Sequence, residues 1–254
     1  MAIVIRWYGN ACFVVEGAGT SIAIDPWITG NPGCPIGVDE FPPVEAVLVT
    51  HGHPGHYGNG DALVIARDND APFIAPRALI EYVRSSVPVS VTCKLRAVDA
   101  GDVVRVGAIT AKVVSVPHPP VRPHVGSAGP PGDPNVGFRV LVEGMHLLHM
   151  GDARSDPELL SALAADCEPT DVALMPLWCE EMGWSEADAV SSVRDIIAVL
   201  QPALVIPHAR YSPANGSAAL LRKALGSSQS SILDLAPGDR VVVIGDPGRD
   251  HYQA

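Results

Sequence analysis

The sequence predicts an α/β protein in which layers of sheet and helix pack on one another. Two patterns carry this prediction. Short strands separated by turns fill the first half of the chain, and strands alternate with helices in the last third. No linker or low-complexity segment lies between the two parts, so we expect one domain over residues 1–254. Hydrophobic residues make up 47% of the chain and charged residues 18%, which supports a large buried core.

The first half is expected to be rich in strands, because apolar runs there are bounded by Gly, Pro and Asp. Gly107 and the pair Glu143-Gly144 lie between such runs and predict two hairpins. Helices are expected from Asn59 to Arg67, with Asn59 as the N-cap, and from Pro76 onward. The expected strands and hairpins cover residues 3–8, 12–17, 21–26, 45–50, 71–76, 86–98, 102–117 and 137–152.

The last third reads as strands followed by helices. Residues 155–157, Ser-Asp-Pro, open one helix, and Ser185 with Asp188 forms a capping-box pattern before a second. Pro202 ends this second helix. Its expected apolar face consists of Val190, Val193, Ile197 and Leu200. Strands are expected over residues 171–177, 203–208 and 239–245, and a further helix over residues 218–225.

Charge and cysteine content argue against several functional classes. The formal net charge is -11 and no run of Lys or Arg occurs, so we expect no binding to nucleic acid. No apolar run approaches the ~20 residues that span a bilayer, and Arg6 and Asn10 interrupt the N-terminal apolar stretch. Neither a membrane span nor a signal segment is therefore expected. Five scattered cysteines without a C-x-x-C pair predict a reduced, cytoplasmic protein.

The most informative stretch is VLVTHGHPGHYGNG, residues 47–60. His51 and His53 are two residues apart where a predicted strand ends, so both rings point to one face if the backbone stays extended. His56 follows across Pro54-Gly55, which would turn the chain back. Three imidazoles within six residues suit a divalent ion such as zinc. A histidine-rich loop without a function is the alternative, but the position directly after a buried strand favours a metal site.

Three further ligand-type residues stand at the ends of apolar strands. They are His118 after VVSVP, Asp152 at the end of HLLHMGD, and His208 at the end of ALVIPH. Each alone is a weak signal, because an isolated histidine at a strand end more often makes an ordinary hydrogen bond. Together they supply the imidazoles and the carboxylate that a two-ion site requires, at the strand ends where α/β layers place their active sites.

The order H-x-H-x-x-H, a distant His, G-D and a C-terminal P-H resembles the metallo-β-lactamase superfamily. The opening IRWYGNACFVVEGAGTSIAIDPWITGNP is similar to a branch of small metal-dependent hydrolases related to ascorbate-6-phosphate lactonase. The likeness extends from about residue 3 to residue 213, in order and with similar gaps. It implies a four-layer αββα sandwich, with two sheets face to face, helices outside and a metal site at one edge.

The resemblance also implies roles for the candidate residues. The expected ligands are His51, His53 and His118 for a first ion, Asp152 as a bridge, and His56 and His208 for a second ion. Asp152 and His56 are the predicted catalytic residues. One or two divalent ions are implied, with zinc favoured and manganese or iron as alternatives. The implied chemistry is hydrolysis of a small ester, lactone, amide or phosphoester by a metal-bound water whose pKa is near ~7.

This sequence departs from the family pattern at four places. Gly55 stands where the family has an aspartate whose carboxylate binds the second ion, and Asn10 replaces a histidine common in this branch. Ala153 follows the G-D pair where threonine is usual, and Ala209-Arg210 replaces the usual residues after the last histidine. Without the carboxylate at position 55, a second ion is expected to bind more weakly, and a mononuclear enzyme is an alternative.

Residues close to the proposed ligands are candidates for substrate binding. Arg210 would clamp an anionic substrate through its guanidinium group, with a surface ion pair as the alternative interpretation. Trp178 follows a predicted strand at its functional end and is expected to line the pocket. Glu180 or Glu181 could supply the carboxylate that position 55 lacks. The expected partner is a small-molecule substrate, and a homo-oligomer is left open.

Two other functional classes are kept beside hydrolysis. A mononuclear iron or manganese protein with the same fold would be an oxidoreductase or a lyase, and a coloured, redox-active preparation would indicate it. A metal-poor relative would act as a binding or regulatory module, with Gly55 as a sign of lost catalysis. Failure to bind any ion tightly would indicate that third class.

Overall fold

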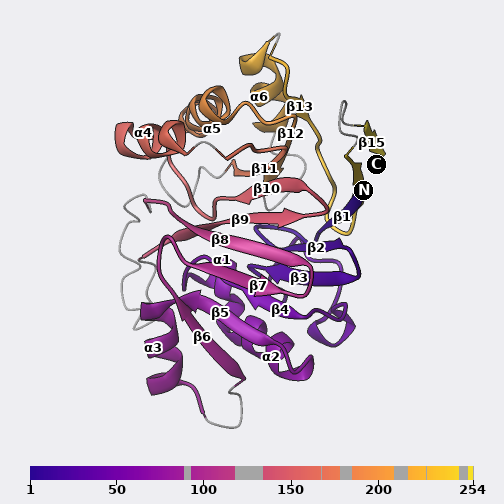
Figure 1. The fold of residues 1–254 in the computed structure, drawn as a ribbon, viewed down its shortest axis with the longest axis vertical. Coiled ribbons are helices and arrows are strands. Elements are labelled where there is room, and N and C mark those ends of the chain that lie inside the picture. Colours follow the sequence, from indigo (N-terminus) through magenta and orange to yellow (C-terminus); the bar gives the residue numbers. More distant parts are fainter. Residues whose placement is uncertain are drawn as a thin grey trace.

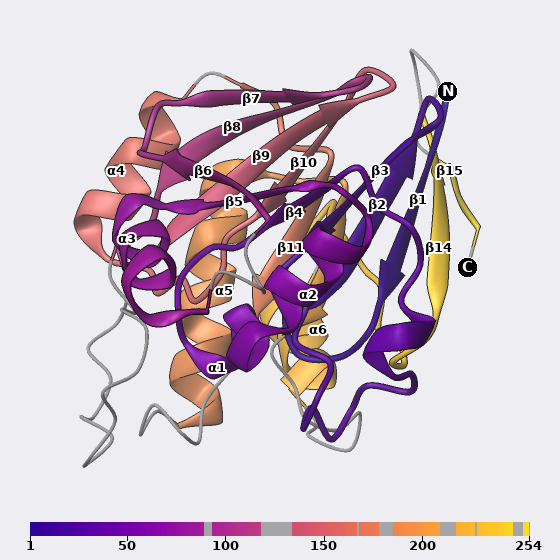
Figure 2. The same cartoon turned by 90° about the horizontal axis from the view of Figure 1, so that it is seen from below.

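The computed structural model describes residues 1–88, 93–117, 134–166, 168–177, 185–208, 217–226, 228–245 and 251–253. Within these residues, two β-sheets lie face to face and helices cover the outer face of each (Figure 1, Figure 2). The four-layer αββα arrangement implied by the sequence resemblance is therefore confirmed.

The first sheet has eight strands among the described residues, in the order β15-β14-β1-β2-β3-β4-β5-β6. Its strands from β3 to β6 pair in parallel, and the other pairs are antiparallel. The strands are β1 (Ala2–Trp7), β2 (Phe13–Gly17), β3 (Thr20–Ile24), β4 (Ala46–Leu48), β5 (Pro72–Pro76), β6 (Lys94–Val98), β14 (Arg240–Ile244) and β15 (His251–Gln253).

The second sheet has seven strands among the described residues, in the order β13-β12-β11-β10-β9-β8-β7. Its strands from β10 to β13 pair in parallel, and β7 to β10 form antiparallel hairpins. The strands are β7 (Val103–Val106), β8 (Ile109–Ser115), β9 (Val136–Val142), β10 (Met145–His149), β11 (Val172–Pro176), β12 (Leu204–His208) and β13 (Ser231–Ile232).

The helices divide between the two outer faces. The first sheet is covered by α1 (Pro54–Tyr57), α2 (Asp61–Asp68) and α3 (Arg77–Ser86), with the 3₁₀ turns η1 (Val38–Glu40) and η2 (Gly58–Gly60) beside them. The second sheet is covered by α4 (Pro157–Ala165), α5 (Glu186–Leu200) and α6 (Ser217–Leu225). None of the helices within the described ranges combines the length and apolar character that crossing a membrane requires.

Alternation along the strands builds three hydrophobic layers. In β3, Ile22 and Ile24 point between the sheets, whereas Ala23 points toward α2 and α3. The layer between the sheets is fully buried and contains Trp7 and Phe13 from the first sheet and Phe138 from the second. Because side chains on a strand alternate between its two faces, each sheet contributes to this central layer and to one outer layer.

Most expected elements are present, and two predicted helix starts were wrong. The expected N-cap Asn59 lies in η2 with a left-handed φ of 52°, so Gly60 is the N-cap and the first helix begins at Asp61. The next begins at Arg77, with Pro76 as its extended N-cap residue. The capping box of Ser185 and Asp188 is confirmed. The short strands β13 and β15 were not predicted.

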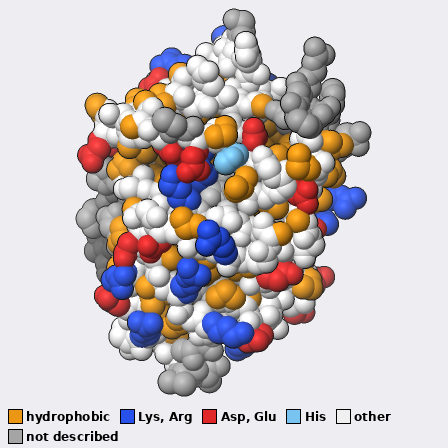
Figure 3. All heavy atoms as spheres, viewed as in Figure 1, with side chains coloured by type: hydrophobic (Ala, Val, Ile, Leu, Met, Phe, Trp, Pro, Cys, Tyr) orange, Lys and Arg blue, Asp and Glu red, His pale blue; other side chains and the backbone are white. Residues whose placement is uncertain are grey.

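The carboxyl ends of the parallel strands are what position the candidate site. β3, β4, β10 and β12 end toward one edge of the sandwich, and the chain continues there into Asp25, His51, Asp152 and His208. The face of the molecule seen in Figure 3 carries acidic, basic and hydrophobic side chains intermixed, as expected for a chain without a single basic stripe. The strand ends are therefore the place to look for chemistry.

Candidate metal centre

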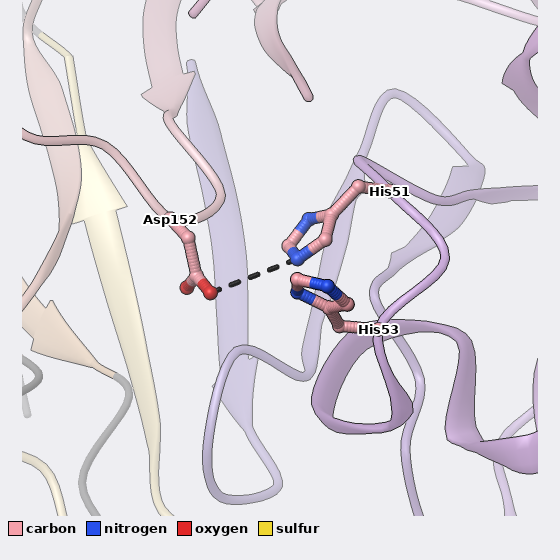
Figure 4. Close-up of side chains that lie close together, drawn as sticks. All are labelled: His51, His53 and Asp152. Atoms are coloured by element: carbon pink, nitrogen blue, oxygen red, sulfur yellow. Dashed lines mark ion pairs between the residues drawn. The ribbon is translucent and has the colours of Figure 1, made fainter. Parts of the chain in front are cut away.

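Potential metal ligands from the two sheets meet at this edge. His51 and His53 follow β4 of the first sheet, and Asp152 follows β10 of the second. One ligand atom from each of these three residues lies within 4.8 Å of the others. Figure 4 shows the two imidazoles and the carboxylate pointing toward one another. Two imidazoles and one carboxylate form a donor set that zinc, iron and manganese accept.

The spacing of these ligand atoms fits a shared ion. His51 Nε2 lies 3.6 Å from Asp152 Oδ2, and both side chains are buried. Two atoms that each bind one tetrahedral ion at about 2 Å lie roughly 3.3 Å apart. His53 is half-buried, and its ring meets the His51 ring edge-on with centroids 4.8 Å apart. His51, His53 and Asp152 therefore form a donor set that fits a metal ion.

The His51 ring is oriented by the residue before it. The Thr50 hydroxyl lies 2.7 Å from Asp25 Oδ2 and 3.0 Å from His51 Nδ1. Because a carboxylate only accepts, the single hydroxyl proton goes to Asp25, and His51 Nδ1 must donate to the Thr50 oxygen. This assignment leaves the lone pair of His51 Nε2 directed toward Asp152, which is the state that a metal ligand needs.

His56 lies between two carboxylates. Its Nδ1 is 2.7 Å from Asp25 Oδ2, and its Nε2 is 3.1 Å from Asp152 Oδ1. Burial alone would lower the pKa of His56, but the negative charges of Asp152 and Asp25 outweigh it and raise the pKa to about 10. In the metal-free protein, His56 is therefore an imidazolium that connects Asp25 to Asp152.

His149 holds the loop that carries Asp152. Its Nδ1 accepts a 3.1 Å hydrogen bond from the backbone N–H of Gly151, so Nε2 carries the proton and donates to the carbonyl of Ala11 at 3.1 Å. Burial lowers the pKa of His149, which keeps this ring neutral. The ring also stacks on His208, with centroids 4.8 Å apart and an interplanar angle of 15°.

Gly151 is required where the loop turns. Its φ is +56°, and a Cβ built on it would lie 2.6 Å from Asn135 Oδ1 and 2.9 Å from Thr50 Oγ1. The backbone of this loop thus approaches the first sheet more closely than any side chain permits. In the G-D pair of the sequence, the glycine therefore permits this close approach, and the aspartate that follows it supplies the candidate ligand.

The structure does not describe every predicted site residue. His118, Trp178, Glu180, Glu181 and Arg210 lie outside the described residues. His208 is fully buried at the end of β12, and its role as a ligand for a second ion stays a prediction.

Sequence reasoning missed two residues that shape the site. Thr50 received no role, although it follows the same strand as His51. The position of His149 within a predicted hairpin strand indicates only a packing or surface residue, whereas the structure shows it fully buried and hydrogen-bonded to Gly151. Its position two residues before the G-D pair is the only signal that the sequence offered. Asp61 lies in the first turn of α2, and its carboxylate accepts hydrogen bonds from the backbone N–H groups of Ile28 and Thr29.

Comparisons with known proteins agree with this geometry. A family described as the beta-lactamase superfamily domain matches residues 4–209. A UPF0173 metal-dependent hydrolase of Archaeoglobus fulgidus is 33% identical over 177 residues, which are 68% of this chain and 70% of that protein.

Solved structures show the same fold. Igni18, a metallo hydrolase of Ignicoccus hospitalis, has a TM-score of 0.75 at 20% identity, covering 97% of this chain and 100% of its own. CmlA, a diiron beta-hydroxylase of Streptomyces venezuelae, has a TM-score of 0.68 at 15% identity, covering 94% of this chain and 53% of its own. At these identities, the two likenesses bear on the fold alone.

The first prediction concerns Asp25 and pH. In the metal-free protein, Asp25→Asn should lower the pKa of His56 from about 10, because one of its two facing carboxylates becomes neutral. Since the folded pKa lies above the unfolded value of 6.5, the stabilisation is present below pH 6.5 and is lost as the pH rises toward 10. The melting temperature of the wild type should therefore fall over this range more than that of the variant.

Imidazole nitrogen NMR measures the pKa directly. Asp61→Asn is the matched control, because Asp61 is a buried carboxylate whose hydrogen bonds go to Ile28 and Thr29 instead of His56. Its His56 should titrate as in the wild type. An unchanged His56 pKa in Asp25→Asn would contradict the assigned ion pair.

The second prediction separates two roles of His149. His149→Phe keeps an aromatic ring beside His208 but removes the acceptor for Gly151, so zinc affinity should fall by roughly 10- to 100-fold. His149→Asn keeps an acceptor near the Nδ1 position and should retain most of the affinity. Competition with a chromophoric chelator measures both. Equal losses in the two variants would show that the Gly151 hydrogen bond is not what positions Asp152.

Proposed function

The chain belongs to the beta-lactamase superfamily and, within it, to the UPF0173 family of metal-dependent hydrolases, and we propose that it hydrolyses a small ester, lactone, amide or phosphoester at a metal centre built around His51, His53 and Asp152. The observation that carries this proposal is the convergence of these three ligand atoms within 4.8 Å at the ends of strands from both sheets. His118, which follows β8 in the sequence, is proposed as the fourth ligand.

The residues of the chain have separable tasks in this proposal. His51, His53 and Asp152 bind the ion through two imidazole nitrogens and a carboxylate oxygen. Thr50 fixes the proton of His51 on Nδ1, so that the lone pair of Nε2 points toward Asp152. A bound divalent ion supplies Lewis-acid polarisation of the scissile group and lowers the pKa of a water molecule. Zinc is the proposed ion, with manganese or iron as alternatives.

Proton transfer is assigned to the groups beside the ligands. Asp152 offers a second oxygen, Oδ1, that faces His56 Nε2 at 3.1 Å. His56 is held from behind by Asp25, so a proton on Nε2 has a fixed direction toward Asp152. We assign proton handling during hydrolysis to this pair, because both ring nitrogens of His56 lie at hydrogen-bond distance from carboxylate oxygens.

Substrate recognition is proposed to come from residues that follow β11 and β12 in sequence. Trp178 comes two residues after the end of β11, and Arg210 two residues after the end of β12. An indole would cover an apolar part of the substrate, and a guanidinium would pair with an anionic group. A small-molecule substrate is therefore proposed, and an anionic one if Arg210 faces the site.

A second function is favoured by one specific observation. Two histidines and one carboxylate with open positions are also the ligand set of non-haem iron enzymes that activate oxygen. His51, His53 and Asp152 form such a set. CmlA shows that this fold also carries a diiron beta-hydroxylase. An iron-loaded preparation that consumes oxygen with a hydroxylatable substrate, and hydrolyses none of the esters tested, would favour this oxidative function.

The third prediction tests the metal centre. His51→Ala and Asp152→Ala should each lose the tightly bound ion and lower kcat/KM for hydrolysis by at least ~100-fold, because each removes one of the three converging ligands. Elemental mass spectrometry measures the ion, and a panel of lactones, esters, amides and phosphoesters measures activity after loading with zinc, manganese or iron.

His146→Ala is the matched control. His146 lies on β10 next to the site in sequence, but its side chain is not among the gathered ligands. It should keep both the ion and the activity. Wild-type protein that binds no ion under any loading would sink the hydrolase proposal and favour a binding or regulatory role.

A further inference from the structure

Two of the four departures from the family pattern touch each other. Asn10 lies in the turn between β1 and β2, and Gly55 lies in α1 between His53 and His56. The two residues are 45 positions apart, yet Asn10 Nδ2 donates a 2.6 Å hydrogen bond to the carbonyl oxygen of Gly55. The histidine-rich segment therefore rests directly on the side chain of Asn10.

The Asn10 side chain is a fixed part of the structure. Asn10 is only 4% exposed, and its φ of 45° is a left-handed conformation that asparagine tolerates better than most residues. The backbone carbonyl oxygen of Asn10 accepts a 2.9 Å hydrogen bond from the indole Nε1 of the fully buried Trp7. Backbone and side chain are thus held by separate contacts, so the carboxamide cannot swing away without breaking one of them.

This carboxamide fills the space beside position 55. A Cβ built on Gly55 would lie 2.7 Å from Asn10 Nδ2, closer than real Cβ contacts allow, and 3.8 Å from Trp27 Cε3. The first atom of any side chain at position 55 would therefore collide with the amide nitrogen. Aspartate at position 55 would therefore require the Asn10 carboxamide to move and to give up its hydrogen bond to the carbonyl of residue 55.

The group that fills this space cannot replace a carboxylate ligand. The Asn10 hydrogen bond to the Gly55 carbonyl shows that the amide nitrogen, a donor, faces the histidine segment. A donor N–H₂ group has no lone pair for a cation. Position 55 therefore supplies no side-chain acceptor for a second ion.

We propose that Asn10 and Gly55 act as a matched pair that makes this chain a single-ion protein. One divalent ion binds tightly around His51, His53 and Asp152, and a second carboxylate can enter at position 55 only when Asn10 is replaced. The inference rests on the proposed metal centre and adds the number of ions to it. It also states which residue excludes the second ion.

The fourth prediction is a set of metal counts on four proteins. Wild type, Gly55→Asp, Asn10→Gly and the double variant Asn10→Gly/Gly55→Asp are loaded with zinc, desalted and analysed by elemental mass spectrometry. The first three should hold one zinc per chain, and the double variant should hold two. Glycine is chosen at position 10 because it accepts the left-handed φ of 45°. Cobalt absorption spectra provide a second readout that needs no substrate.

Gly55→Ala adds a Cβ at position 55 without adding a carboxylate, so it tests the steric contact with Asn10 separately from metal binding. It should lower the melting temperature by a few degrees in the wild-type background and by clearly less in the Asn10→Gly background, because the contact at 2.7 Å is then absent. It should add no zinc in either background. If the double variant does not fold, this comparison and the number of zinc ions per wild-type chain still test the matched-pair proposal.

Each alternative result has a definite meaning. Two tightly bound zinc ions in the wild type would overturn the inference and leave the metal centre intact. A second zinc in Gly55→Asp alone would also overturn it, because Asn10 would then exclude nothing. Equal destabilisation by Gly55→Ala in both backgrounds would contradict the proposal that Asn10 and Gly55 are a matched pair. A wild type without zinc would overturn both this inference and the proposed function.

Discussion

The carboxylate of Asp25 is the constraint on which the candidate site depends. It is fully buried, and a buried carboxylate is tolerated only when hydrogen bonds compensate its lost hydration. Oδ1 accepts from the backbone N–H of Thr50 at 2.7 Å, while Oδ2 meets the Thr50 hydroxyl and His56 Nδ1, each at 2.7 Å. One charge therefore fixes both the residue that orients His51 and the ring that faces Asp152.

The distance between the ligands is set by how the two sheets pack. His51 comes from the first sheet and Asp152 from the second, so the central hydrophobic layer determines their separation. The sheets are also joined at the site itself, where the N–H of Val136 donates to the carbonyl of Thr50 at 3.1 Å. A core substitution that moved one sheet by an ångström would therefore change the metal geometry without touching a ligand.

The sequence predicts the ends of strands better than the contacts between them. The runs before His51 and His208 are continuous and apolar and the run before Asp152 is rich in Leu and Met, so their strands and the ligand positions at their ends follow from local pattern. The roles of Thr50 and His149 do not, because their partners Asp25 and Ala11 lie 25 and 138 residues away. The start of α2 was misplaced for a local reason, since the left-handed conformation of Asn59 depends on the fold around it.

The environment of His56 gains a physical explanation when the number of ions is one. In the metal-free protein, its Nε2 faces Asp152 Oδ1 at 3.1 Å and its Nδ1 faces Asp25 Oδ2 at 2.7 Å. With Asn10 occupying the space beside Gly55, no further carboxylate draws an ion toward His56. The ring is then best used as a cationic link between two carboxylates, which holds Asp152 in place for the ion at His51 and His53. If one ion binds, as proposed, His56 is a link between two carboxylates of the protein and not a metal ligand.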